Sequence, residues 1–125
     1  MLERKKTGSH PMTARAPNEP RSQFKSRLEN DYYNHLYVLQ ASGEVKAFWY
    51  ECIKFQIAEG AWYTPDFVVI NDKNEIEVHE VKGSWSARGQ KTAKLRFDAA
   101  RKTYNVFRWV LVEGSRGGWK KTEVT

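Results

Sequence analysis

The chain has 125 residues, 40% of them hydrophobic and 14% aromatic, which is enough to build the core of one domain and excludes disorder throughout. No apolar run approaches the roughly 20 residues that a membrane span needs, and residues 1–6 lack the apolar stretch of a secretory signal. The single cysteine, Cys52, excludes an internal disulfide and a cysteine-rich zinc site. We therefore expect a cytoplasmic protein without a membrane partner.

The formal net charge of +6 is unevenly distributed: residues 1–28 carry a net charge of +5, residues 29–82 carry −6 and residues 83–125 carry +7. Basic ends are typical of proteins that bind polyanions. An acidic centre is not needed for phosphate binding alone, but it is needed where a divalent metal is held beside a phosphodiester. The alternative is an ordinary solvated surface with uneven charge.

Residues 1–21 contain three of the four prolines, several basic residues and no hydrophobic period, which predicts a flexible basic tail before a folded domain at residues 22–125. Apolar residues at steps of three and four then predict an amphipathic helix over residues 22–40, with Ser22 as its N-cap. Glu29 lies on the flank of the apolar stripe of this helix. It is either a solvated helix carboxylate or a functional residue.

The aromatic and β-branched run at residues 45–58 predicts one long or two short strands. Residues 63–70 and 75–82 predict a hairpin around a turn at residues 71–74. A second helix at residues 87–102, a core strand at residues 106–112 and an edge strand at residues 119–124 follow. The expected fold is mixed α/β, with a central sheet backed by helices and the element order α-β-β-β-α-β.

The predicted hairpin brings charged residues to one end of the sheet. Pairing around its turn places Asp66 roughly opposite His79 and Glu80. Strand alternation places Glu80 and Lys82 on one face and turns Val81 to the other. Two carboxylates and one ammonium group therefore converge.

Carboxylates this close repel one another unless a cation lies between them, and oxygen ligands without thiolates favour Mg²⁺ or Mn²⁺ over zinc. We expect Asp66, Glu80 and the carbonyl of Val81 to hold the ion, Lys82 to orient or deprotonate an attacking water, and Glu29 to assist through water or a second ion. The alternative is a salt-bridged strand surface.

Pro65-Asp66, followed after thirteen residues by Glu80-Val81-Lys82, resembles the signature of the PD-(D/E)XK nucleases. The strings Tyr-Thr-Pro-Asp-Phe at 63–67 and Glu-Val-Lys-Gly-Ser-Trp at 80–85 are similar to the phage junction-resolving endonuclease I group and to small phage proteins related to Holliday-junction resolvases. Ser-Arg-Leu-Glu at 26–29 is similar to the first-helix segment of those small phage proteins. The resemblance covers about residues 24–112. The separation of Asp66 from Glu80 is longer than in the endonuclease I group.

The resemblance implies a restriction-endonuclease-like domain and metal-dependent hydrolysis of DNA phosphodiesters that leaves a 5′-phosphate. By position, it implies Asp66 and Glu80 as the metal ligands, Lys82 as the water-positioning residue and Glu29 as an auxiliary acid. A basic stripe on the second helix is then expected to contact the DNA backbone. It comprises Arg88, Lys91, Lys94 and Arg101. The alternative is a solvated amphipathic face.

We therefore expect a Mg²⁺-dependent DNA endonuclease, with Mn²⁺ able to substitute, acting on branched DNA such as Holliday junctions. If the chain is phage-encoded, it acts in the host cytoplasm. Paired cuts in a symmetric substrate favour a homodimer. The alternatives are a nuclease for mismatched, nicked or foreign DNA, a catalytically silent DNA-binding module, and a structural adaptor.

Overall fold

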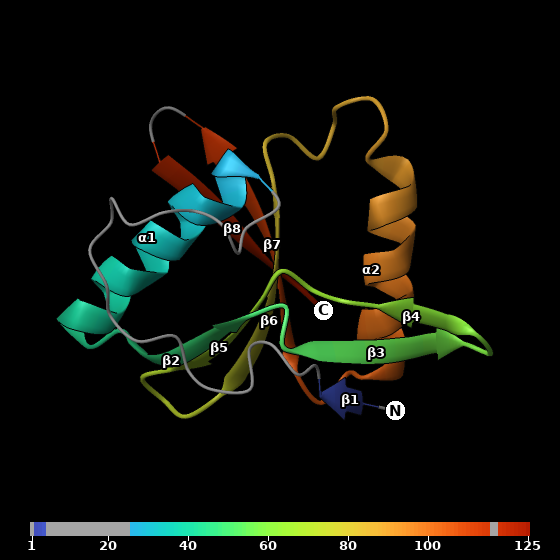
Figure 1. Ribbon diagram of the computed structural model, residues 1–125, viewed down its shortest axis with the longest axis horizontal. Coiled ribbons are helices and arrows are strands. Elements are labelled where there is room, and N and C mark those ends of the chain that lie inside the picture. Colours follow the sequence, from blue (N-terminus) through green and yellow to red (C-terminus); the bar gives the residue numbers. More distant parts are fainter. Residues whose placement is uncertain (1, 5–25, 116–117) are drawn as a thin grey trace.

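Two helices and a five-stranded mixed sheet form most of the described chain, which comprises residues 2–4, 26–115 and 118–125 of a computed structural model (Figure 1). The elements follow in the order β1 (Leu2–Arg4), α1 (Arg27–Ser42), β2 (Val45–Tyr50), β3 (Ile53–Ala58), β4 (Ala61–Tyr63), β5 (Phe67–Asn71), β6 (Ile76–Lys82), α2 (Lys91–Thr103), β7 (Arg108–Ser115) and β8 (Gly118–Val124).

The mixed α/β class is confirmed, whereas the expected element order α-β-β-β-α-β is wrong. The aromatic run at residues 45–58 divides at Glu51 into β2 and β3, which belong to different sheets. Glu51 has a left-handed backbone with φ of 46°, which turns the chain between the two strands. The short strand β4 was not predicted, and the expected C-terminal edge strand forms β8.

The five-stranded sheet has the order β2-β5-β6-β7-β8, in which β6 and β7 are parallel and the other neighbours are antiparallel. A parallel pair needs a crossover, and α2 supplies it. A second, three-stranded sheet has the order β1-β3-β4. Leu2–Arg4, which fall in the predicted tail, form β1, and residues 5–21 lie outside the described part of the chain.

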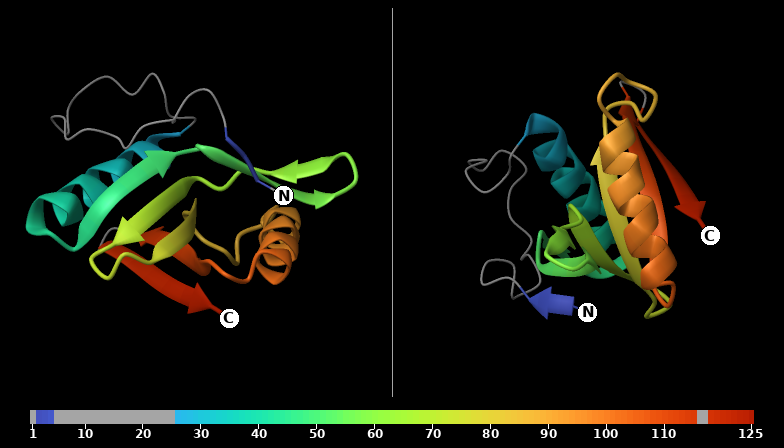
Figure 2. Two further views of the ribbon diagram at one scale, coloured as in Figure 1. Left: turned by 90° about the horizontal axis from the view of Figure 1, so that it is seen from below. Right: turned by 90° about the vertical axis from the view of Figure 1, so that its right-hand side faces the viewer.

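Each face of the large sheet has its own hydrophobic core. Under α1, Tyr32 and Leu36 pack with Phe67 and Val81. Under α2, Phe97 and Ala100 pack with Trp109 and with residues of the β3–β4 hairpin. The two helices therefore cover opposite faces of the large sheet (Figure 2). The end of the sheet at which β5 begins and β6 ends lies between the two cores.

Capping residues determine where α1 begins, beside this end of the sheet. The hydroxyl of Ser26 caps the helix by accepting a hydrogen bond from the backbone N–H of Glu29 at 3.2 Å. The predicted N-cap, Ser22, lies outside the described residues. Gly43 ends the helix with φ of 89°, a conformation that glycine adopts at little cost. This capping places the Glu29 side chain in the first turn.

The predicted β5–β6 hairpin is confirmed. Its register pairs Phe67 with His79 and Ile70 with Ile76, so Asp66 stands opposite Glu80 just beyond the last pair. Asn71 stabilises the turn, because its side-chain oxygen accepts hydrogen bonds from two backbone N–H groups of the turn at 2.9 and 3.0 Å. In the described part of the chain, neither helix has the length and apolar character to cross a membrane.

Candidate metal centre

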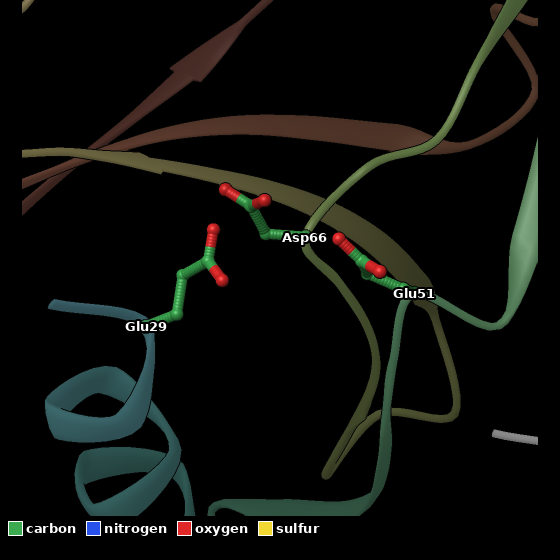
Figure 3. Close-up of side chains that lie close together, drawn as sticks. All are labelled: Glu29, Glu51 and Asp66. Carbon is green, nitrogen blue, oxygen red and sulfur yellow. The ribbon is translucent and has the colours of Figure 1, made fainter. Parts of the chain in front are cut away.

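Three carboxylates from segments far apart in the sequence meet at the end of the large sheet where β5 begins and β6 ends. Glu29 comes from the first turn of α1, Glu51 from the junction of β2 and β3, and Asp66 from the residue before β5. One oxygen atom of each lies within 4.8 Å of the others. Figure 3 shows Glu29 reaching toward Asp66, with Glu51 on the other side of Asp66.

Asp66 is held by two backbone N–H groups. Its side chain accepts a hydrogen bond from the Val81 N–H at 2.8 Å, and its carbonyl accepts one from the Glu51 N–H at 2.9 Å. Only 4% of the residue is exposed. Burial and the neighbouring charge of Glu80 raise the pKa of the Asp66 carboxyl well above its usual range.

Glu80 lies next to Asp66 but is held by other partners. The Tyr63 hydroxyl donates a hydrogen bond to Oε1, and the Lys82 ammonium lies 3.4 Å from Oε2. The residue is 6% exposed, and this burial raises the pKa of the Glu80 carboxyl although Tyr63 and Lys82 both act in the opposite direction. The ionised carboxylate is therefore stabilised by neighbours but destabilised by loss of solvent.

Lys82, two residues after Glu80 in the motif, supplies a cation beside Asp66 and Glu80. Its side chain is 25% exposed, and its ammonium lies 5.9 Å from the centroid of the Trp85 ring. The backbone N–H of Trp85 donates a hydrogen bond to the Glu113 carboxylate at 3.0 Å, which ties the loop after β6 to β7. Lys82 can therefore contact both Glu80 and a solvent-side ligand.

The burial of these carboxylates bears on the two structural alternatives. Glu29, which could have been a solvated helix carboxylate, is 8% exposed and accepts a hydrogen bond from the Tyr50 hydroxyl at 2.7 Å. Asp66 and Glu80 are both buried, and Glu80 forms the ion pair with Lys82 that the salt-bridged alternative expects. Burying like charges together costs free energy unless a carboxyl is protonated or a cation lies between the groups.

Two tyrosines support the carboxylates from opposite cores. Tyr50 packs in the core under α1 and donates to Glu29, whereas Tyr63 packs in the core under α2 and donates to Glu80. Because both rings are buried, each phenol is fixed in place by the packing around it. These contacts were not predicted from the sequence.

Glu51 was also missed by the sequence analysis. The available signal was a single carboxylate within a run of aromatic and apolar residues at positions 47–53, where strand packing does not favour a charge. In the structure, the left-handed backbone of Glu51 also marks it as a candidate functional residue, because this conformation is uncommon for a residue with a side chain and concentrates at functional sites.

The residues fit a hard divalent cation. The donor set consists of carboxylate oxygens, which suit Mg²⁺ or Mn²⁺. The N–H and C=O of a strand residue point to the same neighbouring strand, so the Val81 carbonyl is expected on the same side as the N–H that binds Asp66. Glu80 does not belong to the group of three within 4.8 Å, although its charge acts on Asp66.

The predicted basic stripe is less uniform than expected. Arg88 precedes α2, so its placement on the helix is wrong, whereas Lys91 is exposed on the first turn. Lys94 and Arg101 both pair with Asp98, at 3.0 and 2.9 Å. The carboxylate of Asp98 therefore offsets the positive charge in the middle of the stripe.

No protein-family model, curated protein or solved structure matches the chain.

Proposed function

We propose that this protein is a divalent-metal-dependent DNA endonuclease that hydrolyses phosphodiester bonds. The observation that carries the proposal is the meeting of Asp66 with Glu29 and Glu51 within 4.8 Å, next to the buried Glu80 and the ammonium of Lys82. A cluster of carboxylates and a cation provide both halves of the required chemistry. The carboxylates bind metal, and the cation stabilises negative charge that develops on a phosphate.

Mg²⁺ or Mn²⁺, when bound, polarises a phosphate oxygen and lowers the pKa of a water molecule. Asp66, Glu80, Glu29 and the carbonyl of Val81 are the groups proposed to hold the ion, and Glu51 joins them on the basis of its distance from Asp66. Lys82 donates hydrogen bonds to the attacking water and to the phosphate. Hydrolysis adds this water across the P–O bond and leaves a 5′-phosphate on one product and a 3′-hydroxyl on the other.

One feature favours DNA as the substrate, and a second favours recognition of DNA shape over DNA sequence. The segment that follows β6, residues 83–125, carries a net charge of +7, which suits a polyanion. A domain of this size also has little surface for reading a long sequence. We propose a restriction-endonuclease-like fold with selectivity for branched DNA such as Holliday junctions, which a homodimer would cut in pairs.

The test is cleavage of a labelled four-way junction, a flap, a plain duplex and a single strand, each with Mg²⁺, Mn²⁺ or a chelator. The proposal expects metal-dependent paired cuts near the branch point of the junction. Equal cleavage of all four substrates would retain the endonuclease and overturn the selectivity for branched DNA. Tight junction binding without cleavage would indicate a catalytically silent DNA-binding module.

A further inference from the structure

The β3–β4 hairpin, residues 53–63, leaves the large sheet from between two carboxylates of the candidate metal centre. Glu51 precedes β3 and Asp66 follows β4, and the hydrogen bond from the Glu51 N–H to the Asp66 carbonyl at 2.9 Å closes the base of the hairpin. Figures 1 and 2 show the two strands extending away from β2 and β5 beside α2. We call this hairpin the arm.

The inner face of the arm is anchored to α2. Phe55 and Tyr63, which pair across the two strands, are 1% and 5% exposed and share a core with Phe97. The Tyr104 hydroxyl donates a hydrogen bond to the Gln56 carbonyl at 2.8 Å. The arm is therefore a positioned element whose inner side chains are fixed by packing.

The outer face of the arm carries a cation and an aromatic ring. Because Phe55 and Tyr63 face inward, alternation turns their neighbours Lys54 and Trp62 outward. The Lys54 ammonium lies 5.1 Å from the centroid of the Trp62 ring, and both residues keep part of their surface exposed. An aromatic ring paired with a cation can stack on a base while the cation contacts a phosphate.

A second cation contacts the arm from α2. Arg96 is exposed on α2, and its guanidinium donates a hydrogen bond to the Trp62 carbonyl. Its charge also acts on Tyr63, the residue that donates to Glu80. A guanidinium has five N–H donors, so Arg96 can hold the Trp62 carbonyl and a phosphate together.

We propose that the arm binds an unpaired stretch of a DNA strand, with one base stacked on Trp62 and phosphates bound by Lys54 and Arg96. An unpaired stretch fits because a base within a duplex has both faces covered by its neighbours, whereas an unpaired base has a face free to stack. The idea that this strand is then cut rests on the proposed function. Binding itself can be measured without cleavage.

The experiment measures binding of a fluorescent single strand of about 12 nucleotides to the full chain by anisotropy, with a chelator present and at several salt concentrations. Trp62→Ala is expected to raise the Kd by about 5- to 100-fold, and Trp62→Phe to recover most of the loss. Lys54→Ala and Arg96→Ala are each expected to reduce the slope of log K against log salt by about 0.7. Lys73→Ala, an exposed lysine of the β5–β6 turn, is the matched charge control.

The outcomes separate this proposal from the proposed function. Circular dichroism identifies the folded variants, and Trp62→Phe keeps the test informative if Trp62→Ala does not fold. Wild-type affinity in a folded Trp62→Ala variant, or equal losses from Lys54→Ala and Lys73→Ala, would overturn the arm proposal even if the protein cuts DNA. Loss of binding in the arm variants, with no cleavage by the wild type under any metal, would support the arm and overturn the endonuclease.

Discussion

The backbone N–H of Val81 donates a hydrogen bond to the Asp66 carboxylate at 2.8 Å, linking the residue before β5 to a residue near the end of β6. Val81 stands between Glu80 and Lys82, so this bond sets Asp66 against both of them. It also lowers the pKa of this carboxyl, although burial and the charge of Glu80 raise it by more. The balance between these effects sets the pKa of the Asp66 carboxyl and makes its charge dependent on pH.

Asp66→Asn is expected to stabilise the metal-free protein at neutral pH. The raised pKa means that folded Asp66 holds its proton more tightly than the unfolded chain does. The carboxyl therefore contributes its full stability below its ordinary pKa of 3.8 and loses about 1.4 kcal/mol for each pH unit from there up to the folded pKa. The amide variant does not titrate, so its advantage should grow with pH over this window.

Thermal unfolding in a chelator across a pH series measures this effect. Asp72→Asn, in the exposed β5–β6 turn, is the matched control and should show no comparable gain. A pH-independent difference between Asp66→Asn and the wild type would contradict the account of a buried, proton-binding carboxyl.

Tyr63→Phe is expected to weaken Mn²⁺ binding by about 10- to 100-fold, the usual effect of removing a group that orients a metal ligand. The variant removes the hydroxyl that donates to Glu80 and keeps the ring in its core. Isothermal titration with Mn²⁺ measures the affinity. Tyr104→Phe is the control, because its hydroxyl binds a backbone carbonyl of the arm, and equal effects of the two variants would argue for a merely structural role.

Glu51→Gln tests the carboxylate that the sequence analysis did not identify. Because one Glu51 oxygen lies within 4.8 Å of oxygens of Glu29 and Asp66, loss of its charge should lower Mn²⁺ affinity about tenfold or more. Glu59→Gln, in the exposed turn between β3 and β4, should leave the affinity unchanged. Unchanged affinity in Glu51→Gln would remove this residue from the proposed ligand set.

Asp98→Asn is expected to tighten DNA binding about two- to fivefold at low salt and to steepen the salt dependence. The substitution releases Lys94 and Arg101 from ion pairs at 3.0 and 2.9 Å, so both can contact phosphates. Binding to a chelated four-way junction at several salt concentrations measures the change. An unchanged Kd would mean that the stripe on α2 lies away from the path of the DNA.

The parts of the site that are close in sequence could be predicted, because local rules determine them. The β5–β6 hairpin has a turn of Asn and Asp residues between two apolar strands, so the convergence of Asp66, Glu80 and Lys82 follows from strand pairing. The position of Glu29 on the flank of a helical stripe was also readable, but its burial was not. Its buried position involves Tyr50, which lies on β2 and donates a hydrogen bond to Glu29.

The parts that depend on long-range packing could not be predicted. The run at residues 45–58 has no glycine or proline that would indicate where it divides into two strands. The local sequence also does not predict the left-handed conformation of Glu51 at the turn. Tyr63 meets Glu80 only because the arm folds against α2. The pairing of Lys94 with Asp98, by contrast, was available from their spacing of four residues on a helix.

Cleavage of a labelled four-way junction with Mg²⁺ or Mn²⁺, by the wild type beside Lys82→Ala and Lys73→Ala, tests the central claim most directly. Lys82 lies 3.4 Å from Glu80, whereas Lys73 is exposed in the β5–β6 turn. The account predicts metal-dependent cleavage that falls about 100-fold or more in Lys82→Ala and stays unchanged in Lys73→Ala. Equal cleavage by all three proteins, or none by the folded wild type with either metal, would contradict it.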